Sequence, residues 1–192
     1  MDMNGAYEAE VKQRCPQAQI VYDQFHVVAK YAHEVIESVR SQEVAREHSR
    51  REREILSGSR WLLLRNGPNL KRHDRVRLRE LLRANHRLAT VYVLKDDLKT
   101  LWQYRLPSYA LQFWRKWYAR AIRSRIKPLQ RFARQLGEKI DGILAHCRFP
   151  LHTSLLEGMN NKIKVLKRMA YGFHDDAYFF LKIRAAFPGI GR

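Results

Sequence analysis

Residues 108–126, SYALQFWRKWYARAIRSRI, decide the fold class of this chain. Apolar and aromatic side chains recur here at helical spacing, among them Trp114, Trp117 and Ile122, and this pattern predicts an amphipathic helix. Similar spacing predicts that residues 27–147 are almost entirely helical, with interruptions at Pro107 and Pro128. We therefore expect a mainly α fold.

The composition points to a nucleic-acid partner. The 192 residues allow one or two domains, and 37 Lys and Arg against 19 Asp and Glu give a formal charge of +18. Cations interleave with aromatics, and no apolar run approaches the roughly 20 residues of a bilayer span, so we expect nucleic acid rather than a membrane. The N-terminus shows no secretory signal. Cys15 and Cys147 are interpreted as reduced cytosolic thiols, without any zinc-binding spacing.

The helix at residues 108–126 carries candidate nucleic-acid contacts. Lys116, Arg120 and Arg123 could neutralise phosphates, while tryptophans beside them could stack on bases. The alternative favoured by the spacing places Trp114 and Trp117 in the helical core, which leaves only the cations to contact nucleic acid.

Residues 18–22, AQIVY, form a short β-branched run that predicts a strand. Asp23 and His26 follow at once and begin a helix. This segment is the only convincing strand signal in the sequence.

A second notable helix is predicted near the C-terminus, at residues 153–168. At about 100° per residue, Glu157, Asn161, Lys164 and Arg168 share one polar stripe, and apolar residues gather on the opposite side. Gly172 is a plausible stop. The simplest alternative is an amphipathic helix with a solvated charged face.

Attack on a phosphodiester uses divalent ions that are held by carboxylates from different elements. The candidate acids are Asp2 and Asp23, which flank the predicted strand, and Glu157 from the distant helix.

Three motifs occur together: Asp-Met-x-x-x-Tyr at residues 2–7, Ala-x-Ile-Val-x-Asp-x-Phe-His at 18–26, and Glu-Gly-x-Asn-x-x-Ile-Lys at 157–164. In this order they resemble the catalytic domain of bacterial DDE transposases, with the ISL3 type most similar. The resemblance spans nearly the whole chain. It implies a partial ribonuclease-H-like α/β core of one or two strands, interrupted by a long all-helical insertion.

The resemblance also implies roles for individual residues. Asp2 would be the second catalytic aspartate and Glu157 the catalytic glutamate, both ligands of Mg²⁺ or Mn²⁺. Asp23 and His26 would be structural or would position DNA, although Asp23 remains an alternative second catalytic acid. Asn161, Lys164 and Arg168 would contact the same DNA as Glu157.

The expected domains are a remnant of the catalytic core at residues 1–30, a helical insertion at 31–149, and C-terminal helices of the core at 150–192. The family's first aspartate is expected on an earlier strand that this sequence does not contain. We therefore expect a C-terminal fragment with an incomplete metal site, inactive alone and with exposed sheet edges.

The predicted function is that of a transposase fragment whose intact parent cleaves element ends and joins them to target DNA. The expected setting is the bacterial cytoplasm, in association with the nucleoid, with DNA and possible homo-oligomers with transposase as partners. The alternative is a non-catalytic, basic helical protein that binds DNA or regulates transposition.

Overall fold

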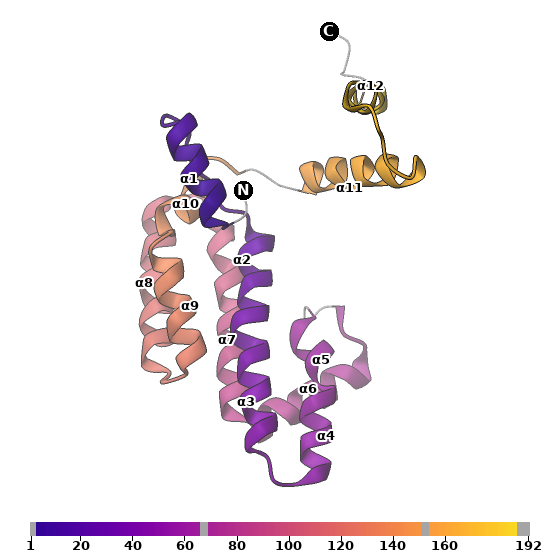
Figure 1. The fold of residues 1–192 in the computed structure, drawn as a ribbon. Coiled ribbons are helices and arrows are strands. Elements are labelled where there is room, and N and C mark those ends of the chain that lie inside the picture. Colours follow the sequence, from indigo (N-terminus) through magenta and orange to yellow (C-terminus); the bar gives the residue numbers. More distant parts are fainter. Residues whose placement is uncertain (1–2, 66–68, 151–153, 188–192) are drawn as a thin grey trace. The chain divides into compact units, whose positions relative to one another are not determined.

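A computed structural model describes residues 3–65, 69–150 and 154–187, with side chains in the last range described from residue 158 onward (Figure 1). The chain divides into two compact units, Met1–Leu151 and His152–Arg192, each of which is described by itself. Throughout the described ranges the regular structure is helical, which confirms the mainly α prediction.

The described elements are, in chain order, α1 (Gly5–Arg14), α2 (Gln24–Tyr31), η1 (Ala32–Glu37), α3 (Ser38–Arg46), α4 (Arg50–Gly58), α5 (Arg60–Leu64), α6 (Arg72–Ala84), α7 (His86–Thr100), η3 (Leu101–Gln103), α8 (Pro107–Arg123), α9 (Lys127–Gly137), α10 (Ile140–Leu144), η4 (Ala145–Cys147), α11 (Ser154–Met169) and α12 (Asp176–Ala186).

One long helix organises the first unit. It consists of α2, η1 and α3, which follow one another without a break, and its hydrogen bonding is π-helical in η1 (Figure 1). The domain boundary predicted between residues 30 and 31 falls inside this helix. Helix α7 packs along it in the opposite direction. The Gln24 amide donates to the Lys99 carbonyl at 3.3 Å near one end, and Arg87 donates to Glu43 at 2.8 Å near the other.

Aromatic residues join this helix pair to the α8–α9 hairpin. The buried Tyr31 ring lies with its centroid 6.4 Å from that of Trp117 and 5.1 Å from that of Phe132. Its hydroxyl donates to the Val91 carbonyl at 2.8 Å, and the Trp117 indole donates to the Leu94 carbonyl at the same distance. Burial of these rings supplies much of the hydrophobic stabilisation of the bundle.

The strand predicted at residues 18–22 was wrong, because the structure has no regular element there. A strand needs a neighbour for its backbone hydrogen bonds, and the described residues provide no second strand. The Tyr22 amide instead donates to the Gly142 carbonyl at 3.0 Å, and the Tyr22 ring is buried above that glycine. The ribonuclease-H-like core therefore stays a prediction.

The second unit is a hairpin of α11 and α12. The Phe173 ring, between the two helices, stacks on the Phe179 ring with centroids 4.8 Å apart. The Lys162 ammonium donates to the Ala186 carbonyl at 2.6 Å. These contacts fix α11 and α12 to each other. Helix α12 is therefore the neighbour of α11 on the side away from its polar stripe.

Candidate nucleic-acid interface

The exposed face of α8 contains the three cations predicted from sequence. Lys116, Arg120 and Arg123 recur at intervals of four and three residues, and all three are exposed. Trp114 and Trp117 are buried on the opposite side, which confirms their core placement. The cations predicted on α8 are therefore exposed, while its two tryptophans belong to the core.

An acid on α7 holds one of these cations in place. The Arg120 guanidinium lies 2.5 Å from the Asp97 carboxylate, and both groups are partly exposed. Lys116 and Arg123 project from the turns on either side of Arg120. A phosphate approaching this face would therefore meet a guanidinium held by Asp97, with one cation on the turn before it and one on the turn after it.

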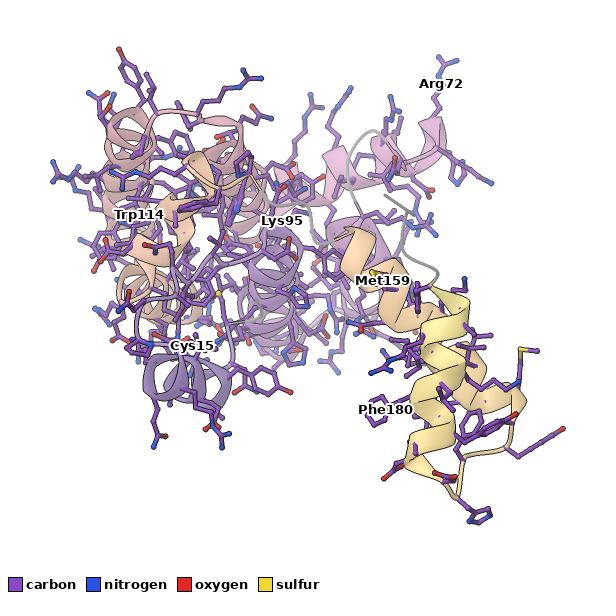
Figure 2. The ribbon with its side chains drawn as sticks, turned by 90° about the horizontal axis from the view of Figure 1, so that it is seen from above. Cys15, Arg72, Lys95, Trp114, Met159 and Phe180 are labelled. Carbon is purple, nitrogen blue, oxygen red and sulfur yellow. The ribbon has the colours of Figure 1, made fainter. Side chains whose placement is uncertain are left out.

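A second cationic stripe, which our sequence analysis missed, lies on α6. Its buried side includes Leu78 and Leu81, and its other side presents a row of exposed cations: Arg72, Arg75, Arg79 and Arg83. Figure 2 shows Arg72 extending away from the ribbon. The signal that could have found the row is its spacing of three and four residues, opposite the leucines.

Helix α11 forms as predicted, with Asn161, Lys164 and Arg168 exposed along one face. Met159, Ile163 and Leu166 are partly buried on the other side, in agreement with the predicted polarity. The Glu157 side chain lies outside the described residues. The backbone does place residue 157 within α11, as predicted.

Asp23 caps α2 and contacts His26. Its carboxylate accepts from the His26 backbone amide at 3.3 Å and lies 2.9 Å from His26 Nδ1. The Asp23 side chain is only 9% exposed, whereas that of His26 is 43% exposed. This arrangement is typical of a helix cap. The alternative catalytic role of Asp23 stays a prediction.

Asp2 lies outside the described residues, but the segment that follows it is firmly held. Met3 is buried, and Glu8 on α1 forms an ion pair with Lys139 beside α10. Hydrogen bonds from Lys12 and then Lys139 lower the pKa of Glu8 to about 2. Charge pairing therefore fixes α1 against the end of the bundle.

The predicted metal ligands lie outside the side chains that the structure describes. Asp2 and the Glu157 side chain are both undescribed, and they belong to different units. Within the described part of the chain, no three His, Cys, Asp or Glu side chains are grouped so that they could hold a metal ion. The Mg²⁺ or Mn²⁺ site therefore stays a prediction from the resemblance.

Rows of exposed cations over an apolar core are typical of proteins that contact a polyanion. Residues 1–183 match the family model for ISL3-type DDE transposases, which is described as a transposase. The chain therefore belongs to the ISL3 family of DDE transposases.

Two relatives illustrate this membership. The chain is 56% identical, over 193 aligned residues, to the transposase for insertion sequence element IS1001 of Bordetella parapertussis; the match covers 100% of this chain and 48% of the relative. It is 29% identical to the transposase for insertion sequence element IS1557 of Mycobacterium tuberculosis, over 86% of this chain and 42% of the relative. The chain thus spans about half the length of these relatives. No solved structure matches it.

Among the described residues, no helix has the length and apolar character needed to cross a bilayer.

Proposed function

We propose that this chain binds DNA during transposition of an insertion sequence, with α8 as a phosphate-contacting surface. The observation that supports this proposal most directly is the row formed by Lys116, Arg120 and Arg123, exposed on one helix face whose reverse is packed in the core. Regularly spaced cations on a rigid helix match the repeated charges of a DNA backbone. Membership of a transposase family, and similarity to the transposase for an insertion sequence element, support DNA as the partner.

The proposed chemistry is metal-dependent cleavage and strand transfer. Asp2 and Glu157 are the residues that would hold the ion, since carboxylate oxygens are the ligands that Mg²⁺ and Mn²⁺ prefer. When bound, such an ion would stabilise charge on the attacking and leaving oxygens of a phosphodiester. Asn161, Lys164 and Arg168 follow Glu157 along α11, where they would hold the DNA backbone next to the reacting bond.

The role of α8 is tested by reversing charge there. The double variant Lys116→Glu, Arg123→Glu should bind a duplex oligonucleotide about ten- to a hundredfold more weakly than the unchanged chain. Removal of two phosphate contacts should also reduce the slope of log affinity against log salt by about 2. Both quantities are measured by fluorescence anisotropy over a series of salt concentrations.

The matched control makes the same change in net charge elsewhere. Arg14 on α1 and Arg50 on α4 have side chains that are 77% and 95% exposed, so Arg14→Glu, Arg50→Glu should fold normally. This control should lose only a few-fold in affinity, through its lower net charge. Equal losses in the two double variants would show that α8 is not a specific contact surface.

A further inference from the structure

The end of α11 has an unusual backbone conformation. The Gly172 amide donates to the Lys167 carbonyl at 3.0 Å, and the Tyr171 amide donates to the Arg168 carbonyl at 3.0 Å. This pair of hydrogen bonds defines a Schellman motif, whose first residue beyond the cap takes a left-handed conformation and is usually glycine. Here Tyr171 takes that position with φ 51°, followed by Gly172 with φ 103°.

The tyrosine side chain gains no burial in return for this strain. Its relative exposure is 102%, the value of a residue in an extended peptide. The next aromatic residue, Phe173, behaves differently and stacks on Phe179. A non-glycine residue held in a disfavoured conformation with its ring in solvent is explained better by a function than by stability.

Tyr171 shares a hollow with three cations. Lys164, Lys167, Arg168, Tyr171 and Gly172 line an open hollow of about 560 Å³. Residues three and four apart are neighbours on a helix surface, so Lys164, Lys167 and Arg168 lie on one face of α11, and Tyr171 borders the same hollow from just beyond the helix end. Interaction with the helix dipole accounts for cations in the last turn, but it does not account for an exposed aromatic among them.

We propose that Tyr171 is a stacking site for an unpaired base of a DNA strand, and that Lys164, Lys167 and Arg168 contact the phosphates on either side of that base. Exposed aromatic rings beside cations bind single strands because every base has a face that can stack. Within a duplex those faces are covered by neighbouring bases, so the ring selects DNA with unpaired nucleotides. This proposal rests on the proposed function, and specifies the form of DNA that α11 recognises.

The test compares two DNA probes: a duplex, and the same duplex with a single-stranded 3′ overhang of six nucleotides. The unchanged chain should bind the overhang probe more tightly. Tyr171→Gly removes the ring and also relieves the strained conformation, so this variant should be at least as heat-stable as the unchanged chain. It should lose roughly 5- to 150-fold in affinity for the overhang probe, the range that corresponds to one lost base stack, and keep its affinity for the duplex.

Two further variants separate stacking from other effects. Tyr171→Trp keeps a stacking ring and should retain the preference for the overhang. Met169→Ala removes another exposed apolar side chain, 74% exposed and two residues away, and should change neither affinity. If Tyr171→Gly binds the overhang probe as well as the unchanged chain does, while duplex binding persists, the stacking proposal fails and the proposed function stands. If the unchanged chain binds neither probe, both proposals fail.

Discussion

Raising the pH from 7 to 9.5 should stabilise the folded chain through Lys95 on α7. The Lys95 side chain is buried, with 1% relative exposure, and its ammonium donates to the Leu63 carbonyl of α5 at 2.7 Å. The ammonium also lies 4.3 Å from the centroid of the Tyr92 ring. Burial lowers the pKa of Lys95 from 10.5 to about 8, against an opposing effect of Asp96 and with a smaller contribution from Lys99.

The sign follows from proton binding in the two states. Between pH 8 and pH 10.5 the unfolded chain keeps the Lys95 proton while the folded chain loses it, so stability rises with pH. With pKa values of 10.5 unfolded and about 8 folded, the free energy of unfolding should increase by about 2 kcal/mol from pH 7 to pH 9.5. The Tyr31 and Cys147 pKa values are raised by burial and act in the opposite direction, mainly at higher pH.

Urea unfolding, followed by tryptophan fluorescence at half-unit steps of pH, measures this dependence. Lys95→Met keeps the length of the side chain and removes the titrating group, so the difference between the two proteins cancels the effects of tyrosine and cysteine. Lys127→Met changes an exposed lysine at the start of α9 and should leave the pH profile as it is. If Lys95→Met shows the same rise in stability as the unchanged chain, the rise does not come from deprotonation of Lys95. The inference that burial lowers the pKa of this lysine then fails.

Two other predictions concern the Tyr22 anchor and the candidate catalytic acid. Gly142→Ala would place a Cβ 2.5 Å from the Tyr22 ring and should lower the free energy of unfolding by about 1–3 kcal/mol. At Gly137 the nearest atom to an added Cβ is 3.7 Å away, so Gly137→Ala should be neutral or slightly stabilising. Urea unfolding of both variants checks this, and equal stabilities would contradict the close packing. Adding Mg²⁺ or Mn²⁺ should change the affinity of the chain for element-end DNA, and Glu157→Gln should abolish that metal effect while leaving metal-free binding unchanged. Anisotropy titrations with and without metal measure both, and a metal effect that persists in Glu157→Gln would exclude this carboxylate as a ligand.

Local sequence was sufficient for most of the helical structure. Pro107 and Pro128 were predicted to interrupt helices, and they lie in the first turns of α8 and α9. Proline fits this position because it lacks the amide hydrogen that a first turn leaves unpaired. The spacing of Trp114 and Trp117 also predicted their buried side correctly, since residues three or four apart share a helix face.

The candidate site was predictable to a lesser extent. Lys116, Arg120 and Arg123 were found as cations interleaved with aromatics. Asn161, Lys164 and Arg168 were found as a helical stripe, and their exposure follows from the periodicity of a regular helix. The arginine row of α6 carries the same kind of signal and was overlooked. The exposure of Tyr171 could not be predicted in this way, because it depends on a backbone conformation beyond the end of the helix.

By itself, the sequence determined the helices, the strong positive charge and the motifs of the ISL3 transposase family, because each depends on composition or on residues a few positions apart. Only the tertiary structure decided which segments lie together. It joined the Lys95 ammonium to the Leu63 carbonyl, and among the described residues it provided no second strand for residues 18–22, since burial and strand pairing depend on neighbours that are distant in the sequence. A pattern within one segment carries no information about those neighbours.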